Sequence, residues 1–302
     1  SGSTSVDRRT SAMVSDVHVL ISPNAGRGRT AGTSADVLDR LRALGAHVID
    51  ISGTDAESSE SNACEAVAGG ARRLIVLGGD GIVHLGVQAV AGTETVLGVI
   101  PIGTGNDFAR GLDWIPDDPL LAASVALHDP ASIDALRCGR RWTVSVATGG
   151  FSGDVNERAE RLRHPKGSSR YTVATLLELP KLDARSLHLE IDGEAFSHQA
   201  TMLAVANTAW FGGGMHIAPD ADPTDGYLDI TVVDEIGRLE LLRFFNRVFN
   251  GTHMSHPKVH GYRGRSVRIT SDEPLTIWGD GEYVGPTPCT IESVPSALRI
   301  AR

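Results

Sequence analysis

Three glycine-rich segments combine a flexible backbone with side chains that can bind phosphate groups or a divalent cation. They read LGGDGIVH over residues 77–84, GVIPIGTGNDFAR over residues 98–110 and SPNAGRGR over residues 22–29. Glycine lets backbone N–H groups approach a phosphate chain at a helix N-terminus, and an aspartate beside the phosphates, such as Asp80, can bind Mg²⁺. These residue types therefore indicate a site for a phosphate-bearing ligand.

Each segment also has a simpler structural explanation. Asp80 suits the N-cap of a helix after a tight turn, Asn106 and Asp107 suit the cap of the next helix, and residues 22–29 suit an ordinary solvated loop. The chain lacks the Gly-Lys-Ser/Thr ending of a Walker A loop at these places, and it lacks the GxGxxG dinucleotide fingerprint. No single segment therefore defines the ligand.

The elements that must position these segments alternate between strands and helices up to about residue 136. The apolar periodicity predicts strands over residues 17–21, 48–51, 74–77 and 96–100, and helices from residue 33 or 34 to residue 44, over residues 63–68 and over residues 83–90. Such a series winds into a parallel sheet that binds ligands at the carboxyl ends of its strands. All three segments follow a strand end, so we expect them to lie together.

After residue 134 the pattern changes to short alternating strands separated by turn residues, which predicts a mostly antiparallel β-sandwich. Two helices are expected within it, near residues 171–179 and 239–249. The predicted organisation is an α/β domain over residues 16–137, joined by a returning strand at residues 296–302, and a β-sandwich domain over residues 138–295.

Taken together, the three segments resemble the diacylglycerol kinase catalytic family, which includes bacterial lipid kinases, sphingosine kinases and ceramide kinases. The resemblance extends to the acidic segment APDADPTDGYLD at residues 218–229 and to Asp280-Gly281-Glu282. It implies a phosphofructokinase-like, Rossmann-like nucleotide domain and a lipid-binding β-sandwich. It also implies transfer of the γ-phosphoryl group of ATP to a lipid hydroxyl with Mg²⁺, with diacylglycerol as the expected acceptor and phosphatidic acid as the product.

The same resemblance assigns roles to individual residues. Asp280 and Glu282 would lie at the reacting hydroxyl, with Glu282 as the general base, although the roles of Asp80 and Glu282 are exchangeable on the sequence. A structural Mg²⁺ would be bound by Asp222, Asp225 and Tyr227. The residues that would bind the nucleotide are Ser22, Pro23, Asn24, Ala25, Gly26, Arg27, Thr54, Gly78, Gly79, Asp80, Gly81, Ile82, Val83, His84, Leu85, Thr104, Asn106 and Asp107.

Two features of the sequence complicate this assignment. The family has Thr where this chain has Ile82 and Asn-Glu where it has His84-Leu85, so we expect altered nucleotide contacts without loss of activity. The tripeptide Asp-Gly-Glu occurs twice, and Asp-Gly between alternating strands is a strong hairpin signal. The family's order of motifs selects Glu282, and Asp192-Gly193 is interpreted as a plain hairpin turn.

Composition bounds the partners and the location. The net charge of −9 argues against electrostatically driven binding of nucleic acid. No apolar stretch is long enough to span a bilayer, Ser1 to Ser15 do not resemble a signal peptide, and three widely spaced cysteines suggest reduced thiols. A cytoplasmic enzyme at the inner face of the membrane is therefore expected, with its oligomeric state open and a homodimer among the candidates.

The basic residues between Arg158 and Arg170 could attract an anionic membrane surface, or they could pair with Glu157, Glu160 and Glu178. A kinase that acts on sphingosine, ceramide or monoacylglycerol would need much the same ATP-binding residues as one that acts on diacylglycerol. A soluble kinase of the NAD kinase type and a non-catalytic nucleotide or lipid sensor are the other functional alternatives.

Overall fold

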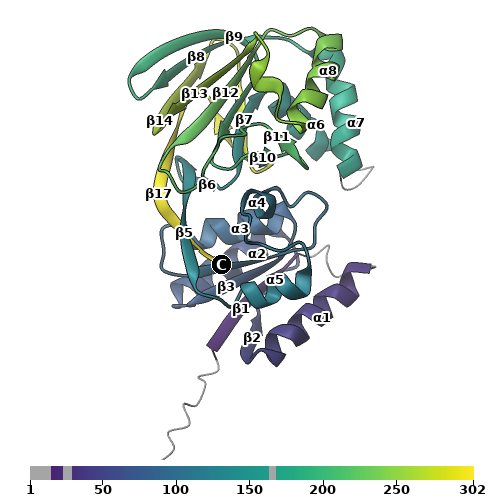
Figure 1. Cartoon of the computed structure of the whole chain (residues 1–302), viewed down its shortest axis with the longest axis vertical. Helices are drawn as coiled ribbons and strands as arrows, with labels where there is room; N and C mark the ends of the chain where they lie inside the picture. Colours follow the sequence, from purple (N-terminus) through teal and green to yellow (C-terminus); the bar gives the residue numbers. More distant parts are fainter. Residues whose placement is uncertain (1–14, 23–28, 163–167) are drawn as a thin grey trace, which may run out of the picture.

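The computed structural model describes residues 15–22, 29–162 and 168–302 (Figure 1). The predicted nucleotide-binding residues Pro23, Asn24, Ala25, Gly26 and Arg27 lie outside these ranges. Within them the chain forms an α/β domain at one end and an antiparallel β domain at the other, as the sequence predicted. None of the described helices has the length and the apolar character needed to cross a bilayer.

The α/β domain is built on a parallel sheet in the order β4-β3-β1-β2. Side chains of α1 and α5 pack on one face of this sheet, and those of α2 and α3 pack on the other. Because the strands are parallel and covered on both faces, they are almost continuously apolar. The elements are β1 (Ser15–Ile21), α1 (Arg29–Ala43), β2 (Ala46–Asp50), α2 (Ala56–Ala68), β3 (Arg73–Gly78), α3 (Asp80–Val90), β4 (Val96–Pro101), α4 (Asp107–Gly111) and α5 (Pro119–Val125).

Two predicted helix boundaries were wrong. Helix α1 begins at Arg29, before the predicted caps at Thr33 and Ser34, and Ser34 is buried inside the helix. Helix α2 begins near residue 56 instead of residue 63, because Asp55 caps it by accepting a hydrogen bond from the Ser58 amide. The first turns of α2 are rich in serine and glutamate, so apolar periodicity could detect only its last part.

The second domain is an antiparallel sandwich whose core lies between its sheet layers. A second apolar cluster lies under α6, α7 and α8, which cover an outer face (Figure 1). The elements are β5 (Pro130–Cys138), β6 (Arg141–Thr143), β7 (Val146–Gly150), α6 (Phe151–Arg161), α7 (Ser168–Glu178), β8 (Arg185–Ile191), β9 (Glu194–Ala206), β10 (Trp210–Phe211), β11 (Met215–His216), β12 (Leu228–Asp234), α8 (Arg238–Phe249), β13 (Val259–Gly264), β14 (Ser266–Ser271), β15 (Thr276–Gly279), β16 (Glu282–Pro286) and β17 (Cys289–Ala301).

Strand β17 belongs to both domains. Its first half pairs with β14 of the sandwich, and its last residues pair in parallel with β4, where Arg299 lies opposite Val96. Strand β5 runs antiparallel to β17 along most of this length. One continuous sheet therefore passes from the sandwich into the α/β domain.

Candidate active site

The glycine-rich segments at residues 77–84 and 98–110 meet at the carboxyl ends of the parallel strands, and Ser22, the first residue of the third segment, lies beside them. The Ser22 amide donates to the Leu77 carbonyl at 3.0 Å, and the Ile102 amide donates to the Gly78 carbonyl at 3.0 Å. The backbones are so close that a Cβ on Gly103 would lie 2.5 Å from the Cα of Gly79. Thr54 and Thr104 are exposed on loops at the same edge of the sheet. The loops thus lie side by side, which the strand order requires.

This packing gives a prediction about two glycines. Gly103→Ala forces the loops after β3 and β4 apart, so we expect it to lower the free energy of unfolding by about 1–3 kcal/mol. Gly81→Ala meets open space within helix α3 and should be neutral or stabilising by up to about 1 kcal/mol. Urea denaturation of both variants measures the difference, and equal stabilities would contradict the proposed contact.

Asp80 is the first residue of α3, and the N-cap is Gly79. Oδ1 of Asp80 accepts a hydrogen bond from the Phe108 amide at 3.2 Å, and this bond connects the first glycine-rich segment to the second. Because Gly79 has no side chain to cap the helix, the first amides of α3 remain available to an anion. The capping explanation for Asp80 is therefore wrong in this structure.

Asp107 lies buried beside Asp80. Its oxygens accept hydrogen bonds from the amides of Gly213 and Gly214 at 2.6 and 2.8 Å. A Cβ on Gly105 would lie 2.9 Å from Asp80 Oδ2 and 3.9 Å from Asp107 Oδ2, so this glycine separates the two carboxylates. The Asn106 side chain spans its own loop by bonding to the amide and the carbonyl of Gly103, at 3.0 Å each.

The acidic groups at this junction perturb one another. Burial, together with the neighbouring carboxylates of Asp107 and Asp280, raises the pKa of Asp80 to about 6. Burial also raises the pKa of Asp107, against the hydrogen bond from Gly213 and the charge of Arg110. A cation would relieve the repulsion between these carboxylates, so the donor set suits Mg²⁺.

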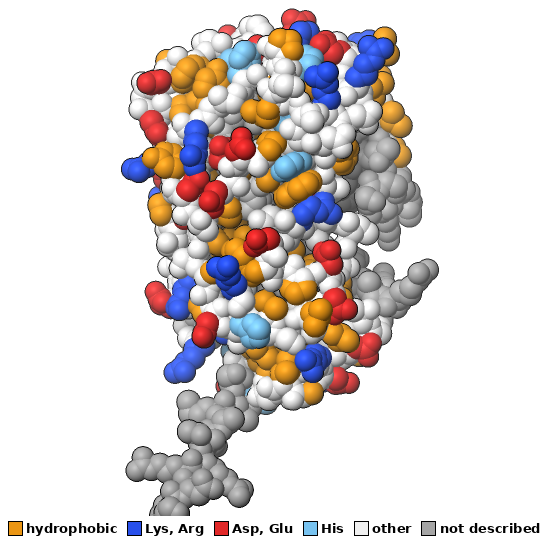
Figure 2. Space-filling view, viewed as in Figure 1, with side chains coloured by type: hydrophobic (Ala, Val, Ile, Leu, Met, Phe, Trp, Pro, Cys, Tyr) orange, Lys and Arg blue, Asp and Glu red, His pale blue; other side chains and the backbone are white. Residues whose placement is uncertain are grey.

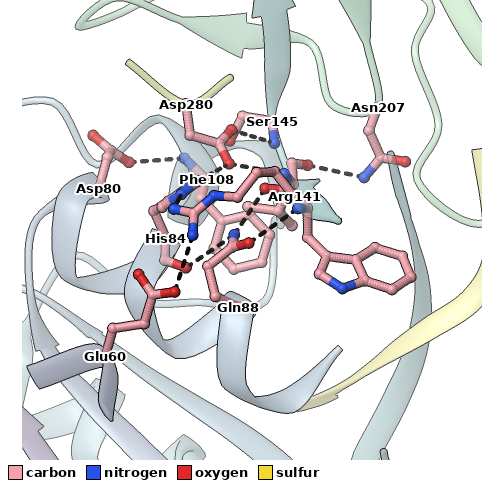
Figure 3. A network of polar contacts seen from close by, with 11 residues as sticks. Glu60, Asp80, His84, Gln88, Phe108, Arg141, Ser145, Asn207 and Asp280 are labelled. Atoms are coloured by element: carbon pink, nitrogen blue, oxygen red, sulfur yellow. Dashed lines mark hydrogen bonds and ion pairs between the residues drawn. The ribbon is translucent and has the colours of Figure 1, made fainter. Parts of the chain in front are cut away.

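Asp280 reaches the same place from the β domain (Figure 3). Its carboxylate accepts hydrogen bonds from the amides of Val144 and Ser145 at 2.9 and 2.8 Å, and Oδ2 lies 3.3 Å from His84 Nδ1. Its side chain is only 4% exposed. The turn that carries Asp280 is therefore held against helix α3 by a buried polar contact between the domains.

The contacts of His84 define its tautomer. Arg141 Nη2 lies 3.1 Å from His84 Nε2, and Arg141 Nη1 pairs with Glu60 at 2.9 Å (Figure 3). A guanidinium can only donate, so Nε2 must accept, and the ring proton lies on Nδ1, where it is donated to Asp280. The residue that departs from the family motif thus orients a residue of the candidate site.

Both Asp-Gly pairs form two-residue hairpin turns with positive φ at each central residue. The interpretation of Asp192-Gly193 as a hairpin is confirmed. Asp192 accepts from the amides of Arg265 and Ser266, much as Asp280 accepts from two amides of the bend between β6 and β7. What distinguishes Asp280 is its contact with His84. Glu282 follows this turn as the first residue of β16, and its side chain is exposed.

The acidic segment is held by a residue that sequence reasoning missed. The buried Asp134 accepts hydrogen bonds from the amides of Gly226 and Ser296 at 2.7 and 2.8 Å. Asp222 accepts from Thr224, and the Asp225 carboxylate pairs with Arg263. The Arg263 and Arg265 guanidinium groups lie 4.6 and 5.2 Å from the Tyr227 ring. A metal ion at Asp222, Asp225 and Tyr227 would therefore have to displace Arg263 from Asp225.

Other residues of the site carried little or no signal in the sequence. Arg141 and Glu60 come from different elements and meet only in the fold. The Gln88 side chain bonds to both the amide and the carbonyl of Trp142, at 3.0 and 2.8 Å, and so joins α3 to β6. The three consecutive glycines at 212–214, all with positive φ, were a visible signal for the loop that binds Asp107.

Comparison with known proteins places this architecture in a family. Residues 16–138 match the diacylglycerol kinase catalytic domain, and residues 145–302 match the YegS C-terminal NAD kinase beta sandwich-like domain. A diacylglycerol kinase of Mycobacterium tuberculosis (strain ATCC 25618 / H37Rv) is 36% identical over 296 residues, covering 96% of both chains. One from Staphylococcus haemolyticus (strain JCSC1435) is 29% identical, over 93% of this chain and 86% of the relative.

The fold agrees with a crystal structure of a diacylglycerol kinase from Bacillus anthracis str. Sterne. The TM-score is 0.73 at 20% identity, over 95% of this chain and 96% of that one. A nucleotide-type α/β domain followed by this sandwich defines a class of two-domain kinases. The chain belongs to the diacylglycerol kinase family and is a kinase.

Proposed function

We propose that the protein transfers the γ-phosphoryl group of ATP to the hydroxyl of diacylglycerol, giving phosphatidic acid. The observation that supports this most directly is the junction of two glycine-rich loops and the N-terminus of α3, where Asp80 and Asp107 lie with Asp280 nearby. Phosphoryl transfer needs positioning and charge stabilisation more than covalent chemistry, and this junction offers both. Membership of the family and the names of the relatives support the choice of acceptor.

Each residue of the candidate site has a separate role in this reaction. Free amides at the start of α3 bind phosphate oxygens, and Asp80 with Asp107 would hold a Mg²⁺ that neutralises charge on the transferred group. Glu282 accepts the proton of the lipid hydroxyl. Asp280, fixed by Val144, Ser145 and His84, positions the turn that presents Glu282. We retain Asp222, Asp225 and Tyr227 as ligands of a structural Mg²⁺.

The test is chemical. The protein is incubated with Mg²⁺ and γ-labelled ATP against mixed micelles of diacylglycerol, ceramide, sphingosine or monoacylglycerol, with NAD as a soluble acceptor. Label in phosphatidic acid is the expected result. Label found only in another lipid or in NAD would mean that this molecule, and not diacylglycerol, is the acceptor. ATP binding without transfer to any acceptor would indicate a nucleotide or lipid sensor.

Helix α8 supplies a surface for an anionic membrane. Its inner face packs on the sheet, whereas Leu239, Leu242 and Phe249 on the opposite side are 74, 44 and 49% exposed. Arg243 and Arg247 are exposed next to this stripe, and they take part in none of the ion pairs of the described residues. Hydrophobic and basic side chains lie together at the upper right of Figure 2, where Figure 1 places α7 and α8.

The basic segment predicted to bind the membrane is less suited to it. Arg158 pairs with Glu178 and Arg161 pairs with Glu157, so the pairing alternative holds for these two arginines of the segment. Arg163, His164 and Lys166 lie outside the described residues. Under α8 there is also a small apolar cavity next to the sheet, with a volume of about 10 Å³, which is too small to hold an acyl chain. Its lining includes Phe151, Met202, Phe211, Met215, Phe244 and Phe245.

We expect Leu239→Glu combined with Phe249→Glu to weaken binding to phosphatidylglycerol-containing vesicles by about tenfold or more, since two apolar side chains no longer enter the bilayer. Vesicle co-sedimentation measures this. Leu121→Glu changes a leucine of intermediate exposure (59%, against 74% for Leu239 and 49% for Phe249) on α5 of the other domain and should leave binding unchanged. Equal losses in both variants would contradict docking through α8.

A further inference from the structure

A group of side chains at one end of the sandwich has no part in phosphoryl transfer. His198 of β9, Asp234 at the end of β12 and His260 of β13 meet there, and their ligand atoms all lie within 4.8 Å of one another. His198 Nδ1 lies 2.9 Å from Asp234 Oδ1, and His260 Nε2 lies 2.7 Å from Asp234 Oδ2. Among the described residues this is the one group of three or more His, Cys, Asp or Glu side chains whose ligand atoms come so close together.

The strand register explains why the three side chains meet. A bulge between β9 and β12 sets Val233 opposite Met202 but Asp234 opposite Ala200, so β9 has one extra residue at this point. Bulges re-aim the side chains that follow. His198 of β9 is then a diagonal neighbour of Asp234 on the same face of the sheet. On the strand that flanks β12 on its other side, β13, His260 lies opposite Val232 and is also a diagonal neighbour of Asp234.

The surroundings of the cluster suit a bound cation. Asp234 lies within hydrogen-bonding distance of these two histidines, and it forms no ion pair with a lysine or arginine of the described chain. The His198 side chain is 9% exposed, whereas Asp234 and His260 are 33% and 37% exposed, so the cluster is anchored in the sandwich and open to solvent on one side. An ion can therefore enter without any rearrangement of the core.

A further hydrogen bond orients the most buried histidine. Tyr262 Oη lies 2.8 Å from His198 Nε2, and the Tyr262 ring is itself packed against Phe196 at 4.5 Å between centroids. With Nε2 bonded to the tyrosine, Nδ1 faces Asp234 and the cluster. Metal-binding histidines are commonly held in this way through their second nitrogen.

We propose that His198, Asp234 and His260 bind a divalent transition-metal ion of the zinc class, independently of the kinase reaction. Two imidazoles and one carboxylate are donors that Zn²⁺ accepts, with water completing the coordination. The ion would fasten β9, β12 and β13 to one another just before α8, whose N-cap Gly237 follows Asp234 by three residues. Its role is therefore structural, at the base of the helix proposed to dock on the membrane.

The test uses the full chain after treatment with EDTA, without nucleotide. Equilibrium dialysis against ZnCl₂ should find one Zn²⁺ per chain, with a rise in Tm on addition of the metal. His260→Ala and Asp234→Asn should lose this Zn²⁺ and the rise in Tm, and Tyr262→Phe, which keeps every ligand, should bind about 10-fold more weakly.

The matched control is His47→Ala. His47 forms a similar pair with Asp16 at 2.9 Å on the other domain, but no second histidine of the described chain pairs with Asp16, so this variant should bind Zn²⁺ like the wild type. Absence of binding to the wild type would reduce the cluster to a hydrogen-bonded network and overturn the proposal. Equal binding by wild type and His260→Ala would place the ion elsewhere and overturn it as well. If a ligand variant does not fold, the affinity of Tyr262→Phe decides.

Discussion

Asp80→Asn is expected to lower kcat for phosphoryl transfer by about 10²–10³-fold while making the protein more stable. The loss follows because the variant has no carboxylate to hold Mg²⁺ beside the phosphates. The gain in stability follows from the raised pKa of Asp80, about 6 against 3.8 in the unfolded chain, which means that the fold disfavours the charged form. Removing that charge raises the free energy of unfolding at neutral pH by up to about 3 kcal/mol.

The sign of the pH dependence is fixed by the same shift. The stability associated with Asp80 is present below pH 3.8, where the carboxyl is protonated in both states, and is lost as the pH rises through about 6. Activity runs the other way, because Mg²⁺ needs the deprotonated form, so kcat/KM of the wild type should fall as the pH drops below about 6. Asp80→Asn should lack this part of the pH profile.

Steady-state kinetics and thermal denaturation of the same samples provide the two readouts. The exposed Asp117 supplies the control, since Asp117→Asn removes a carboxylate of the same domain outside the site. A variant Asp80→Asn that is both inactive and less stable would mean that the carboxylate supports the fold and not the metal.

Glu282→Gln should lower kcat by about 10²–10⁴-fold and leave the KM for ATP nearly unchanged, because it removes only the group that accepts the proton of the lipid hydroxyl. The chain contains its own control. Glu194 follows the same Asp-Gly turn at the same position and is exposed like Glu282, but its turn does not contact His84. Glu194→Gln should therefore retain full activity.

The two variants separate the catalytic role from the hairpin role. Full activity of Glu282→Gln would return the role of base to Asp80, the alternative that the sequence left open. A loss shared equally by Glu282→Gln and Glu194→Gln would mean that the hairpins matter for folding and that neither glutamate is the base.

The class of fold could be predicted from the sequence because its signals are local. Buried parallel strands such as Leu74 to Leu77 are apolar throughout, and glycines mark their ends, so the order of elements follows from short stretches of chain. Boundaries were less predictable where a helix begins with polar residues, as α2 does after Asp55. In α2 the hydrogen bonds of the cap determine where the helix begins, and the spacing of apolar residues gives no sign of these bonds.

The site was predictable where its parts lie within one motif. Asp80, Asn106 and Asp107 lie where glycine-rich loops lead into α3 and α4, and the strand order brings those loops together. His84 was assigned to the nucleotide site and noted as a departure from the family motif, but its contacts with Arg141 and Asp280 were not predicted, since these partners are 57 and 196 residues away. Contacts across such distances depend on how the two domains pack, which no local pattern encodes.

The shared strand β17 also has a thermodynamic consequence. Two domains joined only by a hinge could unfold independently. In this chain, however, β17 completes the sandwich beside β14 and also covers the edge of the parallel sheet beside β4. Loss of either half removes hydrogen bonds from the other, so the two lobes share one cooperative unit. A fragment cut at the domain boundary would expose an unpaired strand edge on the α/β side, and such edges promote aggregation.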